Sequence, residues 1–137
     1  MRRIYGQIGL LIIFMLAASV TTWAQKPLKG NWTFNIPTGT GTTTLPIPYT
    51  FKASGKGIIP APTGKINFAY REKGAGFSLI FEAPGAGPGG IDVTVLLRGT
   101  KTDTTVTGST IVVTDMPDPS NPLGFAVFAG PLTGARN

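Results

Sequence analysis

The chain contains few residues that can perform acid–base or nucleophilic chemistry. It has no cysteine and no histidine, which excludes disulfides, thiol nucleophiles, Ser-His-Asp or Cys-His triads, and zinc sites with Cys or His ligands. The glutamates Glu72 and Glu82 lie on opposite sides of a turn at 73–76. A retaining glycosidase needs two carboxyl groups about 5 Å apart in a cleft, but Glu72 is flanked by basic residues in a turn. We therefore expect both carboxylates to be solvated surface groups, and we expect no enzyme.

Two further segments offer weaker chemical signals. Asp115, Asp118 and Asn121 place oxygen atoms three residues apart, which suits a hard cation, but prolines separate them and the glycine of a calcium loop is absent. The glycine-rich segment 85–90 is followed by no helix start and no Lys-Ser/Thr pair, as a phosphate cradle requires. We therefore expect a rigid turn without a metal ion at 115–121 and a flexible loop at 85–90. We expect no cofactor.

The charge balance limits the partners of the protein. The formal net charge is +6, but the basic residues are scattered along the chain, so nucleic-acid binding is not expected. A weak attraction to anionic lipid or to a surface polysaccharide remains open. The scattered basic positions are Lys26, Lys29, Lys52, Lys56, Lys65, Lys73, Arg98 and Lys101.

Residues 1–24 have the pattern of an export signal. Two arginines precede an apolar run at 8–20, and the small residues Thr22 and Ala24 precede the expected cleavage site. The run is shorter than the ~20 residues that span a bilayer. We therefore predict a signal peptide, a secreted or periplasmic protein, no membrane span in the mature chain, and one domain over 25–137.

The segment 25–137 is rich in glycine, proline and threonine, which disfavour helix. Apolar residues recur at every second position between turn clusters, and this pattern predicts half-buried strands. Prolines at 46 and 48 predict an irregular or edge half in the second strand, and Gly108 suggests a bulge. The expected strands cover 32–36, 45–51, 65–71, 77–82, 91–97, 104–114 and 123–132.

Short connections between the expected strands exclude parallel crossovers, so the sheet must be antiparallel. The alternation gives each strand one apolar and one polar face. A closed up-and-down barrel of about seven to eight short strands or a two-layer β-sandwich can bury such a face. Because the neighbouring strands are linked as hairpins, we expect the all-β barrel and keep the sandwich as the alternative.

The same alternation places large aromatic residues on one common face. An eight-stranded barrel is just wide enough for side chains to fill, so these residues either pack a solid core or line a lumen for a small apolar or amphipathic ligand. A surface or adhesion module without a ligand cavity is the alternative function. The candidate lumen residues are Phe34, Tyr49, Phe51, Phe68, Tyr70, Phe77 and Phe81.

The two ends of the segment carry a family resemblance. Gly30 and Trp32 resemble the Gly-x-Trp that opens the first strand of lipocalins and other calycin-type barrels, and Arg136 resembles the basic residue of their last strand. The resemblance implies a small exported bacterial lipocalin-like barrel in which Trp32 and Arg136 form a closing pair. An indole filling the barrel end and a guanidinium stacked on it are physically compatible.

Overall fold

The computed structural model describes residues 25–37, 43–62, 64–114 and 126–137. Among them, helix is confined to the 3-10 turn η1 (Pro88–Gly90). The strands are β1 (Gly30–Pro37), β2 (Thr44–Phe51), β3 (Lys56–Ala61), β4 (Gly64–Lys73), β5 (Gly76–Ala83), β6 (Val93–Lys101), β7 (Thr105–Thr114) and β8 (Ala126–Arg136).

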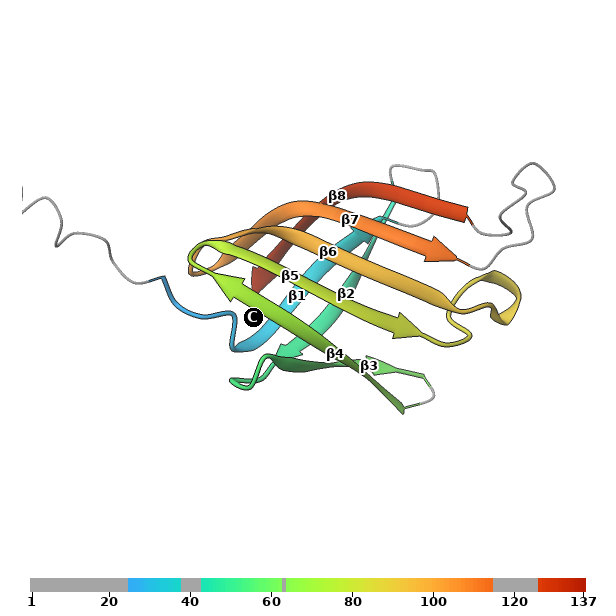
Figure 1. Cartoon of the computed structure of the whole chain (residues 1–137), viewed down its shortest axis with the longest axis horizontal. Coiled ribbons are helices and arrows are strands. Elements are labelled where there is room, and N and C mark those ends of the chain that lie inside the picture. The colour runs from blue at the N-terminus through green and yellow to red at the C-terminus, as the bar shows by residue number, and fades with distance from the viewer. Residues whose placement is uncertain (1–24, 38–42, 63, 115–125) are drawn as a thin grey trace, which may run out of the picture.

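Each strand pairs with its neighbours in the sequence, and β1 also pairs with β8, which closes the sheet (Figure 1). All pairs are antiparallel. The predicted up-and-down barrel is therefore confirmed, and the sandwich is excluded. The eight strands of the described residues lie between Gly30 and Arg136, so a chain that begins at Gln25 contains all of them.

The prolines of β2 act as the sequence predicts. β2 pairs with β1 along its whole length, from Phe51 to Thr44. It pairs with β3 only at Thr50 and Phe51. The half of β2 that contains both prolines therefore has no ladder on the β3 side, where the missing N–H groups would otherwise be needed.

The sequence did not predict β3. This segment lies between glycines and prolines, and Ile58 and Ile59 are adjacent instead of alternating. It nevertheless pairs with β4 along its whole length. A Cβ atom on Gly57 would lie 2.0 Å from the ring of Phe68, so the glycine leaves room for an aromatic ring inside the barrel.

Two other local predictions were wrong. The last strand does not end at Leu132, because β8 continues to Arg136 and its residues 126–135 pair with β7; residues 123–125 lie outside the described residues. There is no bulge at Gly108, which faces Gly99 in a continuous ladder. A Cβ atom at Gly108 would lie 2.1 Å from the carbonyl oxygen of Arg98, so glycine permits a close approach of β6 and β7 here.

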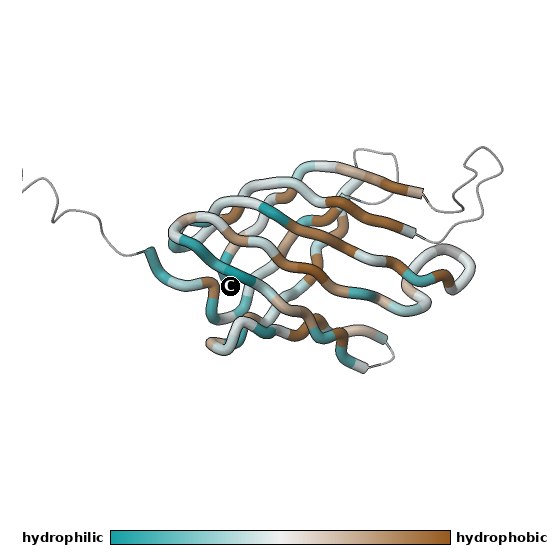
Figure 2. The backbone as a smooth tube through the Cα atoms, in the orientation of Figure 1, coloured by the Kyte–Doolittle hydropathy of each residue, from teal (hydrophilic) through white to brown (hydrophobic). Residues whose placement is uncertain are grey.

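The core lies inside the barrel and follows the two-residue alternation of the strands. Figure 2 shows apolar and polar positions interleaved along the chain. Burying one large apolar side chain contributes about 1.5–3 kcal/mol, and the aromatic residues dominate this interior. The buried apolar side chains are Leu28, Trp32, Phe34, Ile36, Tyr49, Phe51, Ile59, Phe68, Tyr70, Phe77, Leu79, Phe81, Ala83, Val95, Leu97, Val106 and Leu132.

Candidate functional site

One end of the barrel, here the closed end, is covered by the segment 26–29 that precedes β1. The side chains of Leu28 and Trp32 are both 0% exposed, and the indole Nε1 of Trp32 donates a hydrogen bond of 2.7 Å to the carbonyl of Leu28. Gly30 joins this segment to β1 with φ +122°, a conformation that favours glycine. A Cβ atom there would lie 3.2 Å from Nη1 of Arg136, so the glycine also allows a close approach.

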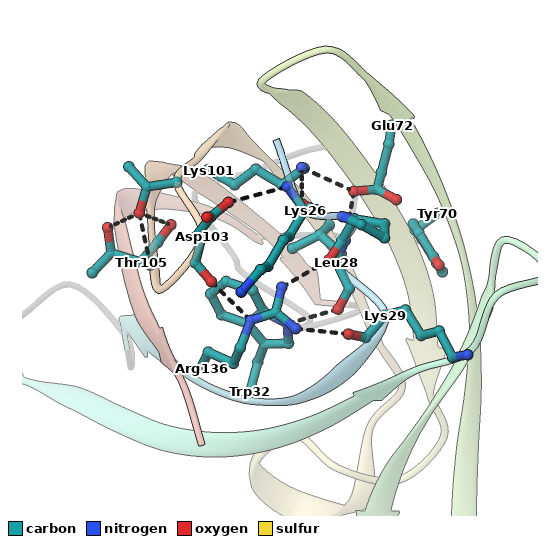
Figure 3. A network of polar contacts seen from close by, with 12 residues as sticks. Lys26, Leu28, Lys29, Trp32, Tyr70, Glu72, Lys101, Asp103, Thr105 and Arg136 are labelled. Atoms are coloured by element: carbon teal, nitrogen blue, oxygen red, sulfur yellow. Dashed lines mark hydrogen bonds and ion pairs between the residues drawn. The ribbon is translucent and has the colours of Figure 1, made fainter. Parts of the chain in front are cut away.

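Arg136 lies against Trp32 from the last strand, with its Cζ 4.5 Å from the centroid of the indole ring. Its guanidinium donates hydrogen bonds to the backbone carbonyls of Asp103, Lys29 and Pro27 at 2.8, 2.8 and 2.7 Å (Figure 3). One side chain therefore connects the end of β8, the β6–β7 turn and the segment 26–29.

Glu72 corrects one expectation from the sequence. It is half-buried, and its Oε1 accepts a hydrogen bond of 2.7 Å from the N–H of Leu28. Lys101, whose side chain is only 2% exposed, places Nζ 3.5 Å from the same oxygen and donates to the carbonyl of Lys26 at 2.6 Å. Barrel closure brings these groups together, and the local sequence gives no sign of it.

The closed end therefore leaves no backbone carbonyl of 26–29 without a donor. Lys101 bonds to the carbonyl of Lys26, Arg136 to those at 27 and 29, and Trp32 to that of Leu28. These contacts are structural, because each polar atom already has a partner within the chain. A ligand would have to displace hydrogen bonds that the fold needs.

The aromatic candidates fill much of the interior. All seven are at most 9% exposed. The ring of Phe34 lies 6.1 Å from that of Phe77, and the ring of Tyr49 lies 6.1 Å from that of Phe81. These contacts join β1 and β2 to β5 across the barrel, and each is worth about 0.5–1.5 kcal/mol beyond its buried area. At this height the barrel is a packed core.

The opposite end, here the distal end, is the end at which β1 and β7 finish. Ile36 and Ala83 are buried there, but four apolar side chains that pack against the core are only half-buried: Ile47, Ile66, Val93 and Val112. Strand ends pair there: Pro37 with Thr44, Ala83 with Val93, and Thr114 with Ala126. The distal end is thus an apolar rim above the aromatic core.

Three buried hydroxyl groups inside the barrel have no hydrogen-bond partner among the described residues: Tyr49 Oη, Thr110 Oγ1 and Thr114 Oγ1. Thr110 is 0% and Thr114 4% exposed. By contrast, the hydroxyl of Tyr70 donates to the carbonyl of Lys52. Burial raises the pKa of Tyr49 above its ordinary value of 10.0, as expected for a hydroxyl in an apolar interior.

Sequence reasoning missed Thr110 and Thr114. Both share the parity of Val106 and Val112 on β7, and the buried positions of that strand are Val106, Thr110 and Thr114. The sequence does show threonine at two positions where the alternation predicts an inward apolar residue. Threonine is also common in strands for its high strand propensity, so its presence did not single out these positions.

The other sequence candidates contribute no chemistry to either end. Glu82 is exposed on β5, and Asp115, Asp118 and Asn121 lie outside the described residues. Among the residues with assigned positions, no group of three or more acidic residues could hold a metal ion. Within that same part of the chain, no helix is long and apolar enough to cross a membrane.

No protein-family model matches the chain, and neither curated proteins nor solved structures give a match. The fold itself defines the class: a closed, eight-stranded, antiparallel up-and-down β-barrel.

Proposed function

We propose that the chain is a non-catalytic, lipocalin-like binding barrel whose distal end takes up a small amphipathic ligand. The observation that carries this proposal is the set of unpartnered hydroxyls on the inner wall, at Tyr49, Thr110 and Thr114. A buried hydroxyl without a partner costs about 1–3 kcal/mol. Hydrogen bonding to a ligand would offset that cost.

The contrast between the two ends supports this assignment. At the closed end the carbonyls of 26–29 all have side-chain donors. On the inner wall three hydroxyls lack partners, among them that of Thr114 at the distal end of β7, and apolar side chains such as Ile66 and Val112 are half-buried. An amphipathic ligand complements both features, because its apolar body covers the rim and its polar group meets a hydroxyl.

The packed rings limit how deep a ligand can reach. Phe51, Tyr70 and Phe77 lie toward the closed end, where Gly30 pairs with Phe51 and Lys73 with Gly76. They serve as core. A ligand therefore rests above the rings of Tyr49 and Phe81 at the distal end. This geometry favours a compact molecule over a long acyl chain threaded through the barrel.

The same proposal includes export. The expected signal at 1–24 would deliver the barrel outside the cytoplasm, and the stacked pair of Trp32 and Arg136 supports the lipocalin-like resemblance. The wall offers hydroxyls without a neighbouring acid or base among the described residues, so we assign binding and no catalysis to it.

The test is a titration with the neutral, polarity-sensitive dye N-phenyl-1-naphthylamine, using the chain from Gln25. The dye should brighten with the wild-type protein. Val112→Trp, which narrows the distal end, should reduce dye binding at least tenfold, whereas Ala69→Trp on the outer face of β4 should leave it unchanged. Equal losses in both variants, or a loss only in Ala69→Trp, would contradict binding inside the barrel.

A second function, a surface or adhesion module that contacts a partner such as a polysaccharide, is favoured by one observation. The ring contacts between β1 or β2 and β5 fill the middle of the barrel. This reading predicts no displaceable dye signal with the folded wild-type protein, and such a result would replace the binding barrel with the module.

A further inference from the structure

The outer face of β4, β5, β6 and β7 carries an arginine pair in register. Arg71 pairs with Ser78, Ser78 with Arg98, and Arg98 with Ser109. These four residues form one row across β4, β5, β6 and β7. Figure 1 shows these four strands side by side. Since adjacent strands are about 4.8 Å apart, the two arginine backbones lie roughly 10 Å apart with Ser78 between them.

A shallow trough runs along this row because β5 has small residues there. Gly76 and Ser78 form its floor, between longer side chains on β4 and β6. The hollow measures about 920 Å³ and is lined in part by Arg71, Lys73 and Arg98. Neither arginine side chain makes an ion pair or hydrogen bond to another described residue. Two guanidinium groups are therefore free to bind an anion.

A row of exposed aliphatic side chains lies directly beside the arginine row. Ile80 pairs with Leu96, and Leu96 with Ile111; these side chains are 52%, 39% and 38% exposed. A second hollow of about 250 Å³ is lined by Ile80 and Leu96 and shares Arg71 with the trough. Contiguous exposed apolar surface of this kind marks an interaction site more often than scattered single residues do.

We propose that this outer face docks on the surface of an anionic phospholipid bilayer. The guanidinium groups of Arg71 and Arg98 would bind lipid phosphates. The side chains of the apolar row would enter the boundary between headgroups and acyl chains, as the apolar face of an interfacial helix does. A bilayer offers both chemistries side by side, in the same order as the two rows.

The charges of this face fit an anionic surface. Lys73 is exposed two residues beyond Arg71 on β4, and the carboxylate of Glu72 is engaged with Lys101 and the N–H of Leu28. Glu82 lies beyond the apolar row on β5. A second copy of the chain is a poor occupant, because a two-fold contact through this face would bring two basic rows together. A nucleic acid would leave the apolar row without a role.

The test is sedimentation of the chain from Gln25 with vesicles of phosphatidylcholine containing about 30 % phosphatidylglycerol, compared with phosphatidylcholine alone. We expect binding only to the anionic vesicles and its loss at about 0.5 M salt. Arg71→Gln/Arg98→Gln should weaken binding about 25-fold, since each basic residue near such a surface contributes about a fivefold factor. Lys52→Gln/Lys56→Gln removes the same charge from exposed positions outside this face and should cost less than twofold.

A second pair of substitutions, one in the apolar row and one control outside it, tests the role of the apolar row. Ile80→Ser and Leu45→Ser change side chains of equal exposure, both 52%, but only Ile80→Ser should weaken vesicle binding. Absence of wild-type binding, equal losses in the two charge pairs, or binding of a short-chain alkyl phosphate without binding of vesicles would each overturn membrane docking. None of these results bears on the distal site, which the neutral dye reports separately.

Discussion

The guanidinium of Arg136 lies over the indole of Trp32, 4.5 Å from Cζ to ring centroid, and donates to three backbone carbonyls at the same time. This contact joins the last strand to the first and to the segment 26–29. It explains how the barrel closes at that end although β8 contains glycine and proline residues.

Arg136→Ala should therefore lower the free energy of unfolding by about 2 kcal/mol. The stacked contact accounts for ~0.5–1 kcal/mol, and the rest comes from carbonyls that lose a charged donor. Lys29→Ala removes a nearby exposed cation and should change stability by less than about 0.5 kcal/mol. Urea denaturation followed by Trp32 fluorescence measures both; equal effects of the two substitutions would show that Arg136 is an ordinary surface residue.

Thr110→Val should raise stability and weaken binding of a hydroxyl-bearing ligand. Valine keeps the shape and removes an unpartnered buried hydroxyl, which should stabilise the protein by about 1 kcal/mol. Affinity for 2-naphthol should fall while that for naphthalene should not, since only the former offers a hydrogen bond. Thr107→Val, at an exposed position of β7, is the control for both measurements. A destabilised Thr110→Val protein would mean that the hydroxyl has a partner.

Tyr49→Phe should flatten the loss of stability at alkaline pH. Burial raises the pKa of Tyr49 in the folded protein, so the unfolded chain loses this proton first. The stabilising effect is complete below the unfolded value near 10 and declines as pH rises above it. Relative to Tyr49→Phe, the wild type should lose up to about 1.4 kcal/mol per pH unit there. Urea midpoints measured on both sides of that pH test it; parallel curves would contradict it.

The exported protein should begin at Gln25. The small residues Thr22 and Ala24 precede that position, and the described structure places the contacts of the closed end immediately after it, from Lys26 onward. The intact mass of protein recovered from the periplasm or medium measures the start. Retention of residues 1–24 would contradict the signal peptide.

The sequence predicted the barrel because alternation is a local property. Seven of the strands could be located from spacing alone, and the inward parity of Phe34, Phe51, Phe68 and Phe81 is present in the structure. β3 could not be located, because its Gly57 is required by the ring of Phe68 on another strand. Packing between strands decides that position, and a single sequence does not display it.

Contacts between strands also explain why the sequence analysis missed features at both ends of the barrel. Glu72 and Lys101 are far apart in the sequence, and only closure places them beside the N–H of Leu28. Thr110 and Thr114 follow strand propensity, and their lack of partners becomes visible only once all neighbours are in place. Hydrogen-bond satisfaction is a property of the whole interior.

The most direct measurement of ligand binding inside the barrel is a ¹H–¹⁵N NMR titration of the chain from Gln25 with 2-naphthol. We predict saturable shifts of the amides of Ile47, Ile66, Thr110 and Val112 around the distal end, with the amides of Arg71 and Arg98 on the outer face unchanged. Shifts confined to the outer face, or no saturable shift at all, would contradict the account.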